Sequence, residues 1–263
     1  MYNSNGKRPL EASRKEVCEV GTLDGKVAVV TGASRGIGRA VAERLGRDGA
    51  RVVVNYVQNS GKAQEVVEAV QASGSQAVAV QADIGRVKDA RRLFQAAEER
   101  FGGVDVVINN ASVSVFKPHA EVSEEEFDRV FGLIARGTFF ALQEAANRLR
   151  DGGRIVTISS GGTVTGGAGA GLYLGAKAAV EQFSLALAKE LGPRGIRVNA
   201  VLPGLTDTDG MIMPPEAVEQ AVNMTPLGRL GQPEDIADVV AFLVGEDGRW
   251  MTGQLVRAGG GLM

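Results

Sequence analysis

Three polar residues stand at a spacing that can support acid–base chemistry on a substrate oxygen. Tyr173 precedes Lys177 by four positions, and Ser160 lies thirteen positions before the tyrosine. On a helix, residues i and i+4 share one face, so this phenol and this ammonium can occupy one site. A nearby cation lowers the pKa of a tyrosine, ordinarily about 10, toward a working pH. Tyr173 could then act as a general acid or base while Ser160 holds the oxygen by hydrogen bonding.

The elements that position this pair decide its interpretation, because a tyrosine and a lysine four residues apart also occur on ordinary helices. Short β-branched segments alternate with amphipathic patterns along the chain, without antiparallel hairpin signals. This alternation predicts βαβ units, right-handed crossovers and a parallel sheet. The expected fold is α/β, a Rossmann-type doubly wound sandwich of three layers. The predicted strands are residues 26–30, 51–54, 77–80, 104–108, 154–158, 196–201 and 254–257.

Helical patterns fill the intervals between these strands. Apolar residues recur with the i, i+3, i+4, i+7 spacing in residues 63–70 and again in residues 90–97. Ser123-Glu124-Glu125-Glu126 has the pattern of a capping box. No linker or repeat divides residues 23–263, and we expect them to form a single catalytic domain. Residues 1–22 are polar, and we expect them to form a flexible N-terminal extension.

The composition narrows the classes of function. Basic and acidic residues are interspersed, with a net charge of −2, so no basic stripe indicates binding to nucleic acid or an anionic membrane. No apolar run approaches the ~20 residues that span a bilayer. Cys18 and His119 are single, which excludes an intrachain disulfide and leaves no histidine-rich metal site. We predict no metal, and we expect a cytoplasmic protein because the first residues contain no apolar signal core.

The first predicted strand runs into a glycine-rich turn, Thr31-Gly32-Ala33-Ser34-Arg35-Gly36-Ile37-Gly38. Its three glycines allow a tight turn and a close approach of a bound group to the backbone. A helix that begins near Gly36 directs free amides and the positive end of its dipole at that group. The strand–turn–helix context therefore predicts a pyrophosphate site.

The second strand predicts which nucleotide binds. NAD sites usually place an acidic residue about 20 positions after the glycines, where it binds the ribose 2′-hydroxyl. Here the strand ends at Asn55-Tyr56, and residues 51–62 contain no Asp or Glu. Arg35 could face the same ribose and, with neutral neighbours, accept a 2′-phosphate. We therefore predict NADP(H), and we expect Asn55→Asp to shift the preference toward NAD.

Polar residues also follow the third and fourth strands. Asp83 could accept a hydrogen bond from the adenine amino group, and Asn109-Asn110-Ala111 would lie beneath the adenosine side. Asp83 and Asn109 could instead be loop caps. Their place at the carboxyl ends of strands, where open parallel sheets bind ligands, favours the binding role.

With these motifs in this order, the chain resembles the short-chain dehydrogenase/reductase superfamily. The resemblance is closest to the branch of 3-oxoacyl-carrier-protein reductases, sugar dehydrogenases and polyketide or naphthol reductases, and it extends over residues 23–263. It implies a parallel sheet of seven strands and often a homotetramer, in which helices near residues 141–150 and 176–191 pair between subunits. The matching motifs are Thr31-Gly-x-x-x-Gly36-x-Gly38, Asn109-Asn110-Ala111, Ser160, Tyr173-x-x-x-Lys177 and Pro203-Gly204.

The resemblance also implies roles for individual residues. Tyr173 would protonate the carbonyl oxygen during reduction, and Ser160 would steady that oxygen. Lys177 would lower the pKa of the tyrosine and bind the nicotinamide ribose. The predicted cofactor contacts are Gly32, Ser34, Arg35, Gly36, Ile37, Gly38, Asn55, Tyr56, Asp83, Ile84, Asn110, Ala111, Tyr173, Lys177, Pro203, Gly204, Thr206 and Thr208, the last of them near the carboxamide.

One position departs from the family pattern. The family often has an asparagine in the long helix after the fourth strand, three residues before a glycine, where it helps to hold a water between the lysine and solvent. Ile134 occupies that position here. Its side chain forms no hydrogen bond. Proton resupply would then be slower or use another route, unless a backbone carbonyl still holds the water.

The substrate is less constrained. Residues 161–171 have no bulky side chains, and residues 205–223, with Met211 and Met213, resemble a mobile lid over an adaptable apolar pocket. We favour an NADP(H)-dependent carbonyl reductase that acts on a moderately apolar ketone or its alcohol. A sugar or polyol dehydrogenase and a non-catalytic NADP(H)-sensing interaction protein are the alternatives. The cofactor preference and a screen of polar substrates would distinguish a sugar or polyol dehydrogenase from the carbonyl reductase. Absence of turnover would indicate the non-catalytic interaction protein.

Overall fold

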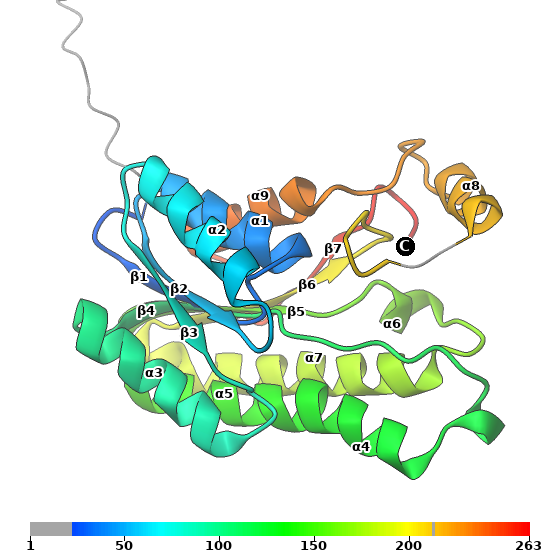
Figure 1. Ribbon diagram of the computed structural model, residues 1–263, viewed down its shortest axis with the longest axis horizontal. Helices are drawn as coiled ribbons and strands as arrows, with labels where there is room; N and C mark the ends of the chain where they lie inside the picture. Colours follow the sequence, from blue (N-terminus) through cyan, green and yellow to red (C-terminus); the bar gives the residue numbers. More distant parts are fainter. Residues whose placement is uncertain (1–22, 212–213) are drawn as a thin grey trace, which may run out of the picture.

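The protein is built on one parallel sheet of seven strands in the order β3-β2-β1-β4-β5-β6-β7 (Figure 1). The computed structural model describes residues 23–211 and 214–263, so the predicted extension at residues 1–22 lies outside the described residues. Each predicted strand is present, which confirms the predicted α/β fold. The strands are β1 (Val27–Val30), β2 (Arg51–Tyr56), β3 (Ala77–Gln81), β4 (Val104–Asn109), β5 (Leu149–Ile158), β6 (Arg197–Pro203) and β7 (Leu255–Ala258).

Helices cover both faces of the sheet, with α1, α2 and α9 on one side and α3, α4, α5 and α7 on the other (Figure 1). In the described ranges, no helix combines the length and the apolar character needed to cross a membrane. The helices are α1 (Gly36–Arg47), α2 (Ser60–Ala72), α3 (Val87–Phe101), α4 (Glu124–Phe131), α5 (Thr138–Arg148), α6 (Gly162–Thr165), α7 (Gly171–Leu191), α8 (Pro215–Met224) and α9 (Pro233–Val244), with 3₁₀ turns η1 (His119–Glu121) and η3 (Gly192–Arg194).

Alternation along β1 shows how the sheet supports both helical layers. Ala28 and Val30 face the core beneath α1, α2 and α9, whereas Val27 and Val29 face the core beneath α3, α5 and α7. All four are fully buried, as expected for a central parallel strand covered on both faces. The chain runs outward from β1 to β3 and returns to β4 beside β1, so the carboxyl ends of β1 and β4 flank the topological switch point.

The helix after β4 differs from the sequence expectation of one continuous helix. Between α4 and α5 lies a π-helical segment, η2 (Gly132–Gly137). A Cβ added at Gly137 would lie 2.9 Å from the carbonyl oxygen of Ile84, so the helix passes close to the loop after β3. Segments of this kind often occur at functional sites. The predicted capping box at the start of α4 is confirmed, with Ser123 and Glu126 bonded reciprocally.

Candidate active site

The glycine turn after β1 has the backbone geometry that its sequence predicts. Gly32 and Gly36 have φ angles of +61° and +54°, which side chains other than glycine rarely adopt. A Cβ on Gly32 would lie 2.9 Å from the Cα of Ala111, and a Cβ on Gly38 would overlap the Gly32 carbonyl oxygen and the Asn110 amide. The turn therefore requires glycine at Gly32, Gly36 and Gly38.

A hydrogen-bond network joins this turn to the end of β4. The Thr31 hydroxyl accepts from the backbone amides of Asn110 (2.9 Å) and Ala111 (3.1 Å). The Asn110 side chain donates to the carbonyls of Thr31 and Gly32. Asn109, in contrast, is buried with neither amide atom bonded to any described residue, so it does not cap a loop. The network holds the two strand ends at the switch point in a fixed relation.

The start of α1 fits a bound pyrophosphate. No described side chain caps its first amides, and its first turn contains no acidic residue. The free N–H groups and the helix dipole there favour an anion. Ser34 and Ile37 are half-buried in the turn, while Arg35 is exposed at the N-cap.

The end of β2 assigns different positions to its two predicted cofactor residues. Asn55 is buried, its Oδ1 accepts from the amide of Gly32 (3.1 Å), and its Nδ2 donates to the carbonyl of Ala82 (2.9 Å). Its side chain therefore supports the turn from within. Tyr56 is the last residue of the strand and is half-buried. The Tyr56 ring packs against the core beneath α1, α2 and α9. Contacts of either residue with the ribose stay predictions.

A second cation lies near Arg35, and the sequence interpretation did not include it. Lys62, in the first turn of α2, forms an ion pair of 2.8 Å with Asp209, which belongs to the segment after β6. Lys62 and Arg35 both lower the pKa of Asp209. The two cations therefore act on the same carboxylate, which joins the start of α2 to the segment after β6.

The loop after β3 shows one of the two roles considered for Asp83, the role of a loop cap. The Asp83 carboxylate accepts from the amide of Gly85 at 3.0 Å, as a loop cap does, yet its side chain is 38% exposed and retains acceptor capacity. Ile84 is buried in the core beneath α3 and α5, so its predicted cofactor contact would come from its backbone. Cofactor contacts by these two residues stay predictions.

The segment after β6 reaches the glycine turn. Pro203 is buried and its carbonyl accepts from the amide of Gly161 at 2.8 Å, which joins the ends of β5 and β6. Gly204 lies against Gly259, while the hydroxyl of buried Thr206 bonds back to the Gly204 carbonyl. Thr208 lies over the glycine turn, with its methyl 3.4 Å from the position of a Cβ on Gly36.

The predicted catalytic residues converge where β5 ends and α7 begins. Lys177 is 3% exposed, and its Nζ donates to the carbonyl of Ile158, the last residue of β5, at 2.7 Å. That Nζ lies 5.8 Å from the ring centroid of Tyr173. Desolvation lowers the pKa of Lys177 to about 8, and the charge of Glu181 opposes this change. Lys177 is therefore protonated at neutral pH.

The Tyr173 phenol faces two hydroxyl groups. Burial raises its pKa above the usual value, and hydrogen bonding with Ser160 and Ser112 opposes that rise. Tyr173 is thus a protonated phenol at neutral pH, the form that donates a proton during reduction. Lys177 donates to a backbone carbonyl here, so a lowering of the tyrosine pKa by lysine stays a prediction. Ser112 was not predicted; the only sequence signal is its position directly after Asn109-Asn110-Ala111.

Two apolar residues that the sequence did not indicate also border the reacting groups. The Met263 side chain packs against Gly161, the residue after Ser160. The Phe116 ring lies 5.6 Å from that of Tyr173 and is 65% exposed. No local pattern links Met263 with Gly161, because the contact joins segments about 100 residues apart in the chain.

Ile134 fills its position with an apolar contact. It is 1% exposed and belongs to a cluster with Val130, Leu172 and Ala176, against which the Tyr173 ring also packs. The expected asparagine position is therefore occupied by a well-packed hydrocarbon within η2. The effect on proton resupply stays a prediction.

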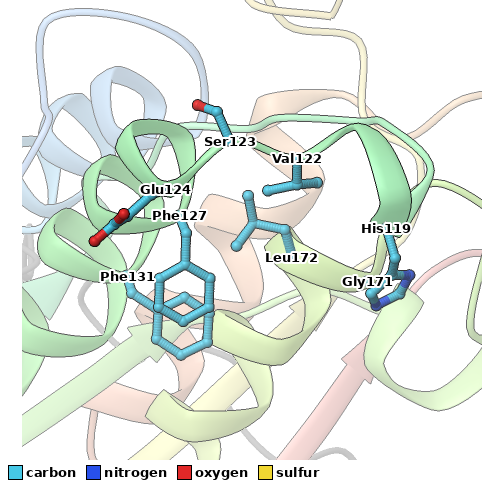
Figure 2. A pocket seen from close by; sticks show the side chains of 8 residues that line it. All are labelled: His119, Val122, Ser123, Glu124, Phe127, Phe131, Gly171 and Leu172. Atoms are coloured by element: carbon cyan, nitrogen blue, oxygen red, sulfur yellow. The ribbon is translucent and has the colours of Figure 1, made fainter.

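A cavity of about 360 Å³ lies between η1, α4 and the start of α7 (Figure 2). Phe127 and Phe131 line it with stacked rings, 4.5 Å between centroids, and His119, exposed as expected, lies at the other end beside Gly171. Each residue turns a helix by about 100°, so Gly171 faces away from the Tyr173 side of α7. We do not assign this cavity to the catalytic site.

Comparisons with known proteins agree with this geometry. A family model described as enoyl-(acyl carrier protein) reductase matches residues 32–263. An uncharacterized oxidoreductase of Methylorubrum extorquens is 48% identical over 244 residues, covering 91% of this chain and 98% of that protein. The hydroxynaphthalene reductase-like protein Arp2 of Metarhizium brunneum is 45% identical over 255 residues, covering 91% and 96%.

A solved structure extends the comparison to three dimensions. The crystal structure of the angucycline C-6 ketoreductase LanV with bound NADP is 42% identical and has a TM-score of 0.88, covering 92% of this chain and 97% of LanV. A Rossmann-type sheet with a glycine turn and a Ser–Tyr–Lys site defines a nucleotide-dependent oxidoreductase. The chain belongs to the short-chain dehydrogenase/reductase superfamily, in its 3-oxoacyl-carrier-protein reductase-like branch.

Proposed function

We propose that the protein is an NADP(H)-dependent reductase that converts a ketone into a secondary alcohol. The convergence of Ser160, Tyr173 and Lys177 beside the glycine turn carries this proposal. Arg35 and Lys62 near the end of β2 support the phosphorylated cofactor. The NADP-bound relative LanV supports the same cofactor and the same reaction class.

The site residues perform the proton half of the reaction. The cofactor, when bound, supplies a hydride that forms the new C–H bond at the carbonyl carbon. Ser160 holds the carbonyl oxygen by hydrogen bonding. Tyr173 transfers its phenolic proton to that oxygen as negative charge develops there, and a proton from solvent then restores the phenol. Lys177, as an ammonium group, would bind the nicotinamide ribose and stabilise the transient phenolate.

The groups around the phenol favour a moderately apolar substrate. Phe116 and Met263 present apolar surface beside Tyr173 and Ser160. Met263 occupies the side-chain position of Gly161, the residue after Ser160. Methionine adapts to varied ligand shapes. The names of the relatives Arp2 and LanV, a hydroxynaphthalene reductase-like protein and an angucycline ketoreductase, support an aromatic polycyclic ketone or quinone.

The direct test is NADPH oxidation against a panel of ketones, acetoacetyl thioesters and quinones, with Tyr173→Phe as the matched variant. We expect the variant to lose about 10²- to 10⁴-fold in kcat, the usual contribution of a general acid. The variant should still bind NADPH, measured by cofactor fluorescence, because its other predicted cofactor contacts remain. Activity retained in Tyr173→Phe would contradict the proposed mechanism.

We also propose that the protein is a homotetramer, while its cytoplasmic location stays a prediction. Phe139 on α5 is 46% exposed, and its ring lies 5.6 Å from that of Phe140 and 5.2 Å from that of Phe183 on α7. This aromatic group joins the two helices that are expected to pair between subunits, which supports the proposal. Light scattering on the purified protein tests this proposal, and a monomer at micromolar concentration would contradict it.

A further inference from the structure

Glu181 is a buried carboxylate whose hydrogen-bond partners differ from those of the two buried carboxylates Asp105 and Glu144. Asp105 and Glu144, also buried, each accept from an arginine, Arg150 at 2.9 Å and Arg148 at 2.8 Å respectively. Glu181 is 7% exposed, and no lysine or arginine among the described residues lies within 4.0 Å of it. A buried carboxyl group needs hydrogen-bond partners, so the groups that Glu181 does bind indicate its role.

The groups that Glu181 does bind flank the catalytic serine. Its Oε1 accepts from the Ser159 hydroxyl at 2.5 Å and from the Thr163 hydroxyl at 2.7 Å. Ser159 directly precedes Ser160, and Thr163 follows it by three positions. One carboxylate oxygen therefore holds the chain on both sides of Ser160, where β5 ends and α6 begins.

The same carboxylate belongs to the helix that carries the other catalytic groups. Tyr173, Lys177 and Glu181 follow one another at i, i+4 and i+8 along α7, and one face presents all three. Below them on that face, Ser184 bonds to the Thr157 hydroxyl at 3.0 Å. Polar contacts thus join α7 to consecutive positions at the end of β5.

The charge of Glu181 also acts on Lys177. The two side chains form no ion pair among the described residues, since Nζ donates to the Ile158 carbonyl. Glu181 is the charged group that favours the ammonium form of this desolvated lysine, with Tyr173 the other titratable neighbour on α7. β5 presents a neutral group to it, the Ile158 carbonyl.

We propose that Glu181 is a positioning residue of the reductase site, which holds the segment of Ser160 against α7 by hydrogen bonding and acts on Lys177 from the same face of that helix. This inference rests on the proposed function. It concerns geometry and charge separately, so two kinds of variant distinguish its parts. Glu181→Gln removes the charge but keeps an oxygen acceptor. The double variant Ser159→Ala/Thr163→Val keeps the charge but removes both hydroxyls.

The experiment measures kcat and KM for ketone reduction as functions of pH in the full chain. We expect Glu181→Ala to lose about 10- to 100-fold in kcat, because small displacements of reacting groups are costly. Without the negative charge, Lys177 loses its proton more easily. The alkaline decline of kcat in the pH profile of Glu181→Gln should therefore move to lower pH than in the wild type. The double variant should have a lower kcat, but the alkaline decline in its pH profile should lie at the same pH as in the wild type.

A second readout does not depend on activity. Amide hydrogen exchange over residues 159–165, in the protein without cofactor, should be faster in Glu181→Ala and nearly unchanged in Glu181→Gln. Ser184→Ala is the control, because it removes a neutral hydrogen bond from the same face of α7. It should lower the melting temperature, while the pH profile of kcat and the amide exchange of residues 159–165 should stay as in the wild type.

The outcomes separate failure of the inference from failure of the proposed function. The inference is overturned if the alkaline decline of kcat in Glu181→Gln lies at the wild-type pH and Glu181→Ala loses no more kcat than Ser184→Ala. Glu181 would then have only a structural role. Unchanged exchange in Glu181→Ala would overturn it as well. If none of the tested ketones supports NADPH oxidation by the wild-type protein, the proposed function is contradicted instead. The exchange data then still test the contact between Glu181 and the serine segment.

Discussion

Two halves of one site, at the same edge of the sheet, hold their residues by different means. Around the glycine turn, backbone amides and carbonyls make most of the contacts, and the network of Thr31 and Asn110 ties them to β4. Around α7, buried side chains make these contacts. Lys177 bonds to the end of β5, and Glu181 bonds to hydroxyl groups. The first half depends on the absence of side chains, and the second on charges that burial makes costly.

This difference has a consequence for mutational sensitivity. A substitution in the glycine turn meets backbone that cannot move aside, because strands β1 and β4 hold it. A substitution at α7 removes a charge or a hydrogen bond, which changes protonation before it changes the fold. Stability and cofactor affinity should therefore report on the first half, and pH profiles on the second.

Gly38→Ala should produce the largest effect in the first half. The added Cβ would overlap the Gly32 carbonyl oxygen and the Asn110 amide, an overpacking that typically costs about 1–3 kcal/mol. We expect this loss in the free energy of unfolding, measured with urea. NADPH affinity should fall more than about tenfold, the equivalent of 1.4 kcal/mol.

Gly192→Ala is the matched control for this prediction. Gly192 has a φ of −51°, and a Cβ there meets no described atom within 4 Å. Its stability and NADPH affinity should equal those of the wild type. The comparison fails if Gly38→Ala binds NADPH as tightly as Gly192→Ala.

The same contrast explains how far the sequence could predict this molecule. The seven strands and the glycine turn follow from local patterns, because β-branched runs and required glycines are visible in the residues themselves. Glu181 and Met263 gave no such signal, since their contacts with Ser159 and Gly161 join separate segments. The π-helical η2 was also not visible, because its residues are ordinary helix formers apart from two glycines.

Side-chain direction at the end of β2 limited the cofactor prediction as well. The missing acid was visible, but which of Asn55 and Tyr56 faces the ribose depends on strand register, and the structure shows Asn55 bonded within the turn. In the catalytic half, the residues Ser160, Tyr173 and Lys177 were visible as a spacing. Their protonation was not, because desolvation depends on the surrounding packing.

Tyr56→Asp should change cofactor preference rather than stability. A carboxylate there would accept from a ribose 2′-hydroxyl and repel a 2′-phosphate. We expect the ratio of kcat/KM for NADPH and NADH to shift about 100-fold toward NADH, since like charges in contact cost several kcal/mol. Asn55→Asp is the control, because it loses the donor to Ala82 inside the protein. It should lower stability more than it changes preference; the reverse result would place Asn55 at the ribose.

The pH dependence of the wild type sharpens the second half of the comparison. The pKa of Lys177 is lowered to about 8 by desolvation, so its ammonium form dominates at pH 7 and is lost above pH 8. Ketone reduction should therefore fall about tenfold per pH unit on the alkaline side, as for any single required proton. Steady-state rates with saturating NADPH test this. A rate that stays level to pH 10 would show that neutral Lys177 suffices.

Ile134→Asn should have the smallest effect, and it tests whether packing or proton supply dominates beside Tyr173. The amide would enter the apolar cluster of Val130 and Leu172, which we expect to lower the free energy of unfolding by about 1–3 kcal/mol. If the isoleucine slows proton resupply, kcat should rise a few-fold and its solvent isotope effect should change. Ile134→Val, which also loosens the cluster but adds no polar group, should leave that isotope effect as it is. No gain in turnover and no change in isotope effect in Ile134→Asn would mean that a backbone carbonyl already serves the lysine, and that this position contributes only packing.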